Sequence, residues 1–500
     1  MPSLASELPR PPCPSTPQVK EENQMQFKPT WQSLTQHGVP TWFDDAKLGV
    51  LIHWGPATIP AWAPIDGNLH QLINEKGFEY YFTHNPYVEW YYNTIRIQGS
   101  PSQKHHLETY GADFSYFDFA PLFNQGIESW NPDDWADLFQ RSGMRYAILV
   151  TKHHDGFLLW PSQHPNPHHR DYQTSRDVTG ELTASVRQRG MKMGLYYSGG
   201  LDWTFNNSVI SDISSHFGSV AQSPEFVAYV DAHWRELIDR YQPSVLWGDI
   251  GYPAAADLPS LFADYYNLIP DGLVNDRFAQ ELPDHLDASE AVINPTNKHF
   301  DFITPEYSSF NQIRQTKWEC TRGIGYSYAY NLNETVDTHL SFAELVHLLV
   351  DVVSKNGNLL LGVGPMSDGT IPPLQRQRLE ELGGWLNVNG EAIFGTRPWV
   401  TAESSTTEAW DTENVPIRFT QKENALYAIT LGTPTGRQMT INSLQAKAET
   451  IIHLLGHDEA LAWRQQDDSL TVMLPETLHP SPAYAFKIIP TPCVGPGIRE

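Results

Sequence analysis

The sequence predicts an α/β protein: a (β/α)8-type, TIM-like barrel followed by a C-terminal β-sandwich domain. From about residue 40, short apolar runs alternate with amphipathic stretches, as in proteins with parallel strands. Residues 53–56, which follow the first apolar run, read His-Trp-Gly-Pro. A dinucleotide-binding fold would need a glycine-rich phosphate turn at this place, so the sequence favours a barrel. From about Trp399 the runs become short, β-rich and separated by turn residues, as in a sandwich.

Three parts are expected along the 500 residues. Residues 1–30 are rich in proline and polar side chains, so they predict a disordered tail that buries little apolar area. Residues 31–396 are expected to form the barrel and residues 397–500 the sandwich. A chain of this length exceeds what one core usually sustains, which supports the division.

The composition points away from nucleic acid and membranes. The formal net charge is −25 and the acidic residues are dispersed, so a nucleic-acid partner is not expected. No apolar run approaches the roughly 20 residues that cross a bilayer. The N-terminus lacks the pattern of a secretory signal, so the cytoplasm is the expected location. Aromatic residues reach 12%, which suits pockets for neutral, hydroxyl-bearing ligands such as sugars.

The cysteines are few, odd in number and widely spaced: Cys13, Cys320 and Cys493. This spacing predicts neither a disulfide framework nor a metal site, and Cys320 is expected to be a buried thiol. No cofactor is expected. The sequence leaves the oligomeric state undetermined, and a homo-oligomer is one possibility.

The elements of the predicted barrel alternate in order. Residues 42–55 predict a short helix that runs into a buried strand ending at His53. Aliphatic and β-branched runs predict strands at residues 145–151, 192–198, 245–248, 272–277 and 359–365. Amphipathic periodicity predicts helices at residues 181–189, 225–241, 261–268, 341–354 and 373–388. The aromatic-rich connection over residues 56–110 is long, and such connections are usually functional.

Asp249 stands directly after the apolar run 245–248, and the chain then breaks at Gly251 and Pro253. In a β/α barrel the loops after the carboxyl ends of the strands build the active site. We therefore interpret Asp249 as a candidate nucleophile. The alternative is an aspartate that caps the following helix.

Nine stretches between about residues 40 and 400 resemble, in the same order, the family 29 glycoside hydrolases, which are the retaining α-L-fucosidases. They read WFDDAKLGVLIHWG, NPYVEWYYN, VTKHHDGFLLW, GLYYSGGLDW, LWGDIGYP, VNDRF, TPEY, KWECTRGIGYSYAYN and NGNLLLGVGPMSDGTIP. The resemblance implies a barrel followed by a β-sandwich, and hydrolysis of terminal α-linked L-fucose from a fucosylated oligosaccharide or glycoside.

The resemblance also implies the two carboxyl groups of the reaction. Retaining glycosidases hold them roughly 5–5.5 Å apart and inverting ones about 6.5–9.5 Å apart. Asp249 matches the nucleophile motif, with Gly248 where an asparagine is usual. Glu306, in Thr-Pro-Glu-Tyr, matches the acid/base, although it lies farther along the chain than expected. A polar insertion at about residues 281–298 explains the longer separation.

Other assignments of the acid/base stay open at this point. Three more glutamates follow in the same loop-rich region: Glu281, Glu290 and Glu319. Glu306 itself has a structural alternative as a surface carboxylate beside a proline turn.

The fucose-binding residues implied by the resemblance are His53, Glu89, Trp90, His153, His154, Tyr196, Trp247 and Arg277. Neutral imidazoles donate and accept hydrogen bonds, as sugar hydroxyls require, and aromatic faces cover a 6-deoxy methyl group. Arg277 is expected to bind a hydroxyl or to keep Asp249 ionised. Adjacent strand residues face opposite ways, so one of Tyr196 and Tyr197 should reach the sugar, and Tyr196 is favoured.

Three other functions remain open. A metal-dependent hydrolase would use as ligands His53, His153, His154, Asp155 and Asp249. Against it, adjacent histidines project to opposite sides of an ideal strand. A binding protein would keep the sugar pocket without turnover. An enzyme that transfers fucose would let another sugar intercept the covalent intermediate.

Overall fold

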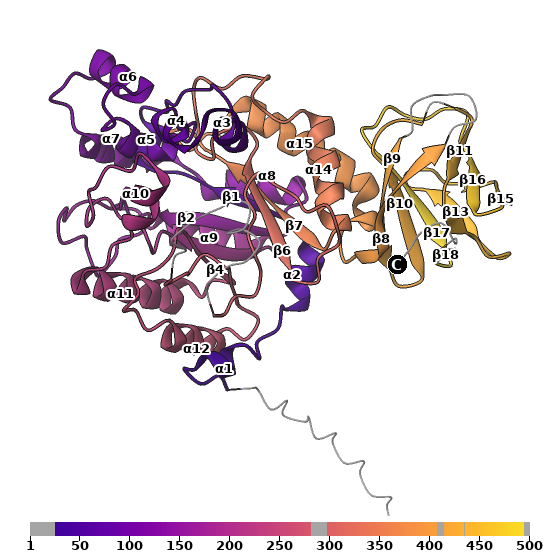
Figure 1. The fold of residues 1–500 in the computed structure, drawn as a ribbon, viewed down its shortest axis with the longest axis horizontal. Helices are drawn as coiled ribbons and strands as arrows, with labels where there is room; N and C mark the ends of the chain where they lie inside the picture. Colours follow the sequence, from indigo (N-terminus) through magenta and orange to yellow (C-terminus); the bar gives the residue numbers. More distant parts are fainter. Residues whose placement is uncertain (1–25, 282–297, 408–414, 435, 495–500) are drawn as a thin grey trace, which may run out of the picture.

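The computed structural model describes residues 26–281, 298–407, 415–434 and 436–494, and Figure 1 shows a β/α domain followed by a β domain at its side. Most of the expected tail and of the expected insertion lies outside these residues, as do Cys13 and Glu290. The tail prediction included Phe27, which instead packs on the barrel. Phe27 is buried and its backbone N–H donates to Asn267 Oδ1 at 2.8 Å.

Seven parallel strands form the central sheet in the order β5-β4-β3-β2-β1-β7-β6. They are β1 (Leu48–Ile52), β2 (Tyr146–Lys152), β3 (Lys192–Tyr197), β4 (Val245–Gly248), β5 (Leu273–Val274), β6 (Trp318–Gly323) and β7 (Gly357–Val363). All residues of β1, β2 and β7 are buried, as expected of parallel strands covered on both faces. Cys320 on β6 is fully buried, as predicted.

The segment 302–306 closes this sheet into a barrel. Parallel bridges join Asn275 to Phe302 on the β5 side, and Ile303 to Trp318 and Glu306 to Thr321 on the β6 side. The segment occupies the place of an eighth strand without forming a continuous ladder. Glu306 therefore stands at its carboxyl end, as Asp249 stands at the end of β4.

Amphipathic helices cover the outside of the barrel (Figure 1). They include α8 (Pro132–Arg141), α9 (Val178–Gln188), α11 (Pro224–Tyr241), α12 (Leu258–Leu268), α14 (Phe342–Ser354) and α15 (Pro373–Asn389). A capping box between Ser341 and Glu344 starts α14, and the side chain of Ser223 caps α11. Such caps satisfy backbone N–H groups that the first turn leaves unpaired. The helices predicted from periodicity are thus confirmed within a few residues.

The connection after β1 is largely helical. It holds α3 (Leu69–Lys76), α4 (Phe78–Thr83), η2 (Val88–Trp90), α5 (Tyr91–Thr94) and α6 (Pro101–Thr109). These elements gather at one end of the barrel in Figure 1. It is the carboxyl end of the strands, since His70 Nε2 lies 2.8 Å from Glu306 O.

The C-terminal domain is an antiparallel β structure that begins with β8 (Arg397–Thr407), whose strands follow the order β14-β13-β17-β10-β9-β8-β11-β16-β15. The other strands are β9 (Pro416–Lys422), β10 (Ala425–Thr430), β11 (Gln438–Ile441), β13 (Ile451–Leu454), β14 (Ala460–Leu461), β15 (Trp463–Gln466), β16 (Ser469–Met473) and β17 (Tyr484–Ile489). Because β8 pairs with both β9 and β11, it joins two sheets around a separate apolar core. The predicted β-sandwich is therefore confirmed.

Side chains of α14 and α15 hold this domain on the barrel. Trp385 Nε1 donates to Ala483 O at 3.0 Å, and Arg418 Nε donates to Asp351 Oδ1 at 2.7 Å. No helix within the described ranges is long and apolar enough to cross a membrane.

Candidate active site

Asp249 follows β4 directly and has a hydrogen-bond donor on each carboxylate oxygen. Tyr196 Oη donates to Oδ2 at 2.6 Å, and Arg277 Nη1 donates to Oδ1 at 2.8 Å. Only 10% of the side chain is exposed. The next helix, α12, begins at Leu258 and is capped by Asp257 instead. The helix-cap interpretation of Asp249 is therefore wrong.

The backbone on both sides of Asp249 is constrained. Gly248 N–H donates to Asn275 Oδ1 at 2.9 Å, and Asn275 Nδ2 donates back to Gly248 O at 3.0 Å. A Cβ added at Gly248 would lie 2.7 Å from the ring of Phe278, so this chain has no room for an asparagine there. Ile250 has a φ of +50°, which is unusual for a β-branched residue. Strained backbone of this kind occurs at functional sites.

Arg277 links the two predicted catalytic carboxylates. Its Nη1 donates to Asp249, and its Nη2 lies 3.4 Å from Glu306 Oε2. Nε donates to Thr304 Oγ1 at 2.8 Å, and the guanidinium lies 4.8 Å from the centroid of the Trp247 ring. Burial alone would lower the pKa of Arg277, but the negative charges of Asp249, Glu306 and Asp276 together outweigh burial and raise it. The guanidinium therefore stays cationic between Asp249 and Glu306.

Glu306 is less enclosed than Asp249, with 22% of its side chain exposed. Tyr87 Oη donates to Oε1 at 2.8 Å. The main chain of Glu306 is held by the contact of its carbonyl oxygen with His70 and by its bridge to Thr321 of β6. Partial exposure suits a group that must exchange protons with a leaving group and with water.

The alternative acid/base candidates do not share this arrangement. Glu319 is fully buried inside the barrel, where burial raises its pKa to about 7. Glu281 is exposed, and Glu290 lies outside the described residues. Among the candidates whose positions are described, Glu306 is the one beside Arg277.

The rings of His53, His153 and His154 gather beside Asp249. Ring centroids of His153 and His154 lie 3.9 Å apart, and that of His53 lies 5.7 Å from His153. The prediction that adjacent histidines project to opposite sides is wrong here, because β2 ends at Lys152 and both rings belong to the turn that follows. Burial lowers the pKa of all three rings, that of His53 to about 3, so they are neutral.

Hydrogen bonds determine the tautomer of His154. Ser198 Oγ donates to Leu201 O at 2.7 Å, so it accepts from His154 Nδ1–H, also at 2.7 Å. In the neutral ring Nε2 then carries a lone pair, and it lies 3.8 Å from Asp249 Oδ2. This nitrogen is placed to accept a hydrogen bond from a hydroxyl bound next to Asp249.

A cavity at the ends of β1 and β2 is lined by His53, His153 and Glu89, among others. Within the described part of the chain, Nδ1 of both histidines is buried without a hydrogen-bond partner. Burial raises the pKa of Glu89 to about 7. Trp90 packs edge-on against His154, with ring centroids 5.4 Å apart. Unpaired polar atoms on a cavity wall, with an aromatic ring nearby, suit a hydroxyl-bearing ligand such as a sugar.

Tyr196 and Tyr197 point to opposite sides of β3, as predicted. Tyr196 Oη reaches Asp249, whereas Tyr197 Oη contacts His233 Nδ1 at 3.0 Å. Trp247 stacks on Tyr196 with ring centroids 5.2 Å apart. Of the two tyrosines, Tyr196 is therefore the one that contacts Asp249, with Trp247 packed along its ring.

Three side chains of the site were not predicted: Tyr87, His216 and Tyr328. Tyr328 stacks on His53 at 4.9 Å, and His216 stacks on Trp90 at 5.7 Å, where burial lowers the pKa of His216 to about 4. Tyr87 belongs to the NPYVEWYYN stretch, two positions before the predicted binding residue Glu89, and this closeness in sequence could have indicated it. His216 stands in a polar connection with no pattern that indicates a site.

The metal-hydrolase interpretation has no support in the geometry. In the described ranges, no three His, Cys, Asp or Glu side chains are grouped to hold a metal ion. Asp155, one of the ligands considered, instead accepts from Tyr116 Oη at 2.8 Å and from the N–H of Phe157 at 3.2 Å.

Comparisons with known proteins identify the family of this chain. The family described as alpha-L-fucosidase matches residues 15–391, and its C-terminal domain matches residues 410–489. The tissue alpha-L-fucosidase of Mus musculus is 33% identical over 465 residues, which cover 90% of this chain and 91% of that protein. The plasma alpha-L-fucosidase of Homo sapiens is 33% identical over 471 residues, which cover 91% of this chain and 90% of that protein.

Solved structures show the same architecture. A Thermotoga maritima alpha-L-fucosynthase in complex with alpha-L-Fuc-(1-2)-beta-L-Fuc-N3 has a TM-score of 0.83 and 40% identity, covering 93% of this chain and 100% of that chain. The alpha-fucosidase of the same organism in complex with a mechanism-based inhibitor has a TM-score of 0.81, with equal identity and coverage. With its barrel, its C-terminal β domain and its paired carboxylates, the chain belongs to the α-L-fucosidase family of glycoside hydrolases.

Proposed function

We propose that this chain hydrolyses terminal α-linked L-fucose by double displacement, with Asp249 as the nucleophile and Glu306 as the acid/base. The observation that carries the proposal is the guanidinium of Arg277, which hydrogen-bonds Asp249 and lies 3.4 Å from Glu306. It holds two carboxyl groups in one site, as retaining glycoside hydrolysis requires. Membership of the α-L-fucosidase family supplies the identity of the sugar.

In the first step the Asp249 carboxylate attacks the anomeric carbon while the bond to the leaving oxygen breaks. Glu306 gives its proton to that oxygen, so the aglycone leaves as an alcohol and a fucosyl ester of Asp249 forms. Arg277 orients the Asp249 carboxylate for the attack, because it donates to Oδ1.

In the second step Glu306, now a carboxylate, takes a proton from water. The water oxygen attacks the same anomeric carbon and breaks the ester, so fucose leaves with its original configuration and both carboxyl groups are restored. The greater exposure of Glu306, 22% against 10% for Asp249, agrees with a group that meets water.

The neutral histidines supply the hydrogen bonds of sugar recognition. His154 Nε2 accepts, and the buried Nδ1 atoms of His53 and His153 take ligand hydroxyls as partners. The aromatic faces of Trp90 and Trp247 cover the apolar side of the sugar.

The test is release of 4-nitrophenol from 4-nitrophenyl α-L-fucoside by the wild type, Asp249→Ala and Glu306→Ala, with and without azide. Asp249→Ala should lower kcat by about four orders of magnitude. Azide should restore part of the turnover of Asp249→Ala as β-L-fucosyl azide, because it attacks from the face of the lost carboxylate. With Glu306→Ala, azide should intercept the ester and give α-L-fucosyl azide.

Opposite anomeric products from the two variants would assign both roles in one experiment. If Glu306→Ala cleaved natural oligosaccharides at the wild-type rate, Glu306 would not be the acid/base. A well-folded wild type that binds fucose without turnover would support the binding-protein alternative instead.

A further inference from the structure

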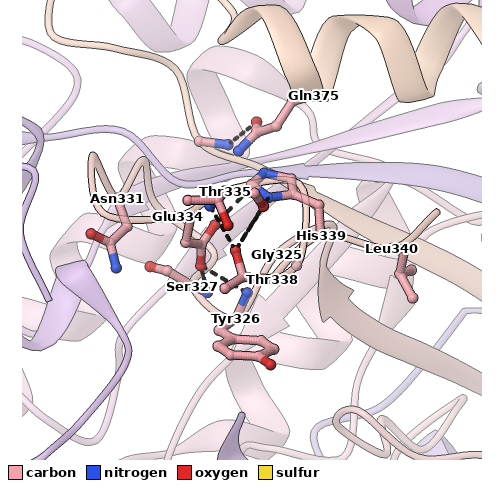
Figure 2. Close-up of polar contacts among 12 residues, drawn as sticks. Gly325, Tyr326, Ser327, Asn331, Glu334, Thr335, Thr338, His339, Leu340 and Gln375 are labelled. Carbon is pink, nitrogen blue, oxygen red and sulfur yellow. Dashed lines mark hydrogen bonds and ion pairs between the residues drawn. The ribbon is translucent and has the colours of Figure 1, made fainter. Parts of the chain in front are cut away.

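Glu334 is a buried carboxyl group that the reaction above does not use. Its side chain is 3% exposed, and its Oε1 accepts the backbone N–H groups of Tyr326 and Ser327, each at 2.8 Å (Figure 2). A methyl group added at Gly325 would overlap Glu334 Oε2, so this glycine lets the carboxyl group lie directly on the loop. The loop 325–329 is therefore held from its outer side by one glutamate.

The same loop carries two parts of the sugar site. Glu89 Oε2 accepts Ser327 Oγ–H at 3.2 Å and Ala329 N–H at 3.1 Å. Between these two residues, Tyr328 stacks on His53 with ring centroids 4.9 Å apart. A shift of the loop would thus move the partners of Glu89 and the ring that covers His53.

The loop also reaches the segment of the acid/base. Tyr307, the residue after Glu306, donates its hydroxyl to Tyr326 O at 2.8 Å and accepts Gly323 N–H at 3.1 Å. Tyr307 has a φ of +49°, a conformation that a bulky side chain adopts only when its surroundings hold it. The hydrogen bonds of the Tyr307 hydroxyl stabilise this conformation, directly beside Glu306.

The neighbour of Glu334 on the side away from the loop is His339. His339 Nδ1 lies 2.8 Å from Thr335 O, so Nδ1 carries the hydrogen, and Nε2 lies 3.7 Å from Glu334 Oε2. Burial raises the pKa of Glu334 to about 8 and lowers that of His339. Burial thus favours the uncharged form of both groups, and Glu334 holds the loop as an acceptor through Oε1.

We propose that Glu334 is a positioning residue of the active site, which acts through the loop 325–329 on three site residues: Glu89, Tyr328 and, by way of Tyr307, Glu306. The proposal rests on the function proposed above, because it assigns Glu334 an effect on the sugar pocket and on the acid/base together. Its carboxyl group lies behind the loop and is not itself a catalytic residue.

The test compares Glu334→Leu with Glu334→Gln. Leucine keeps the bulk but leaves two buried N–H groups without an acceptor, whereas glutamine keeps a carbonyl oxygen for them and an N–H donor for His339. Glu334→Leu should lower kcat/KM by about 10- to 100-fold, the scale of a small misplacement of catalytic groups. It should also raise the inhibition constant of L-fucose, and Glu334→Gln should restore both values to near wild type.

The leaving group separates positioning from general destabilisation. Because Tyr307 adjoins Glu306, the loss in Glu334→Leu should be larger for a fucosyl oligosaccharide than for 4-nitrophenyl α-L-fucoside, which needs little acid assistance. A general loss of folded protein would lower both rates by the same factor.

Glu236→Leu is the matched control. Glu236 on α11 also holds a loop, since it accepts from Trp160 Nε1 at 3.2 Å, Ser162 Oγ at 2.5 Å and Gln163 N–H at 3.1 Å, on the outside of the barrel. The Glu236→Leu variant should lose thermal stability, as Glu334→Leu does, but it should keep the wild-type kcat/KM and the wild-type affinity for fucose.

Wild-type kinetics in a folded Glu334→Leu would overturn the proposal, and so would a glutamine variant as impaired as the leucine variant. Should Glu334→Leu fail to fold, Tyr307→Phe tests the same connection to Glu306 and should show the same dependence on the leaving group. An inactive wild type would count against the proposed function, whereas an active wild type with unaffected variants would count against the role of Glu334 alone.

Discussion

The two carboxylates of the site belong to halves of the barrel that are built differently. Asp249 directly follows a regular strand, β4, which is paired on both sides by β3 and β5. Glu306 ends the irregular segment 302–306, which isolated bridges join to its neighbours.

The contacts of the two groups differ in the same way. Asp249 is held by Tyr196 on the adjacent strand β3 and by Arg277 after β5. Glu306 is held by Tyr87 and His70, which come from the helical connection after β1. The proposed nucleophile is thus held mainly from the sheet, whereas the proposed acid/base is held largely from the connection after β1. Loops vary more readily than sheets, so the half that meets the leaving group is the half that can adapt to it.

Removing the residue that spans both halves should have the largest effect. Arg277→Met leaves Asp249 as a buried charge without its cation, which costs about 3–5 kcal/mol. We expect kcat/KM for 4-nitrophenyl α-L-fucoside to fall by about 10³-fold, with Arg277→Lys between this variant and the wild type because lysine lacks the planar fork. If a folded Arg277→Met variant kept about 50% of the wild-type kcat/KM, the two carboxylates would not depend on this guanidinium for their function.

Tyr196→Phe tests the nucleophile half. It removes a hydrogen bond to a charged, buried oxygen, a loss of about 1.5–3 kcal/mol. Steady-state kinetics should show a loss of roughly 10- to 100-fold in kcat/KM. The factor should be the same for good and poor leaving groups, because the contact is to Asp249 and not to the acid.

Tyr87→Phe is the matched change in the other half, since it removes one hydroxyl from Glu306. Because Glu306 is partly exposed, water replaces part of the lost contact, and we expect less than about a 10-fold loss with 4-nitrophenyl α-L-fucoside. The loss should grow as the leaving group becomes poorer. Equal leaving-group dependence in Tyr87→Phe and Tyr196→Phe would contradict the division between the halves.

Glu319→Gln tests a residue that packs below the Asp249 half of the barrel, and its effect is measured on the stability of the protein rather than on its activity. Trp247 Nε1 donates to Glu319 Oε1 at 3.0 Å, and burial raises the pKa of Glu319 from 4.5 to about 7. Between these values the folded state keeps a proton that the unfolded state has lost, so this group makes the wild type less stable as pH rises.

Glutamine does not titrate, so its variant is free of this loss. The unfolding free energy of the variant, relative to that of the wild type, should therefore rise by up to about 3 kcal/mol between pH 4.5 and 7. Urea denaturation of both proteins at the two ends of this range measures the gain. A difference that stays constant with pH would show that Glu319 ionises at its ordinary pKa.

Local pattern was sufficient for six of the seven strands of the central sheet, for the main helices and for the residues that end those strands, but it did not predict β6 (Trp318–Gly323). Asp249 and His53 could be predicted because an apolar run bounded by turn residues determines where a strand stops, and parallel strands bring their carboxyl ends to one face. Alternation of side chains along a regular strand predicted that one of Tyr196 and Tyr197 reaches the site, and counting along the chain from His154 favoured Tyr196. The residue matches with the family then supplied the identity of the sugar.

Only the tertiary structure showed which of the described candidate glutamates lies beside Arg277. Glu319 lies on a regular strand yet faces the closed interior, while Glu306 lies on a segment that becomes strand-like because β5 and β6 leave a gap for it. The shared direction of His153 and His154 depended on where β2 stopped. Tyr87 meets Glu306 across 219 positions of sequence, and Glu89 meets Ser327 across 238. Contacts of this range arise from closure of the whole barrel, which no local periodicity specifies.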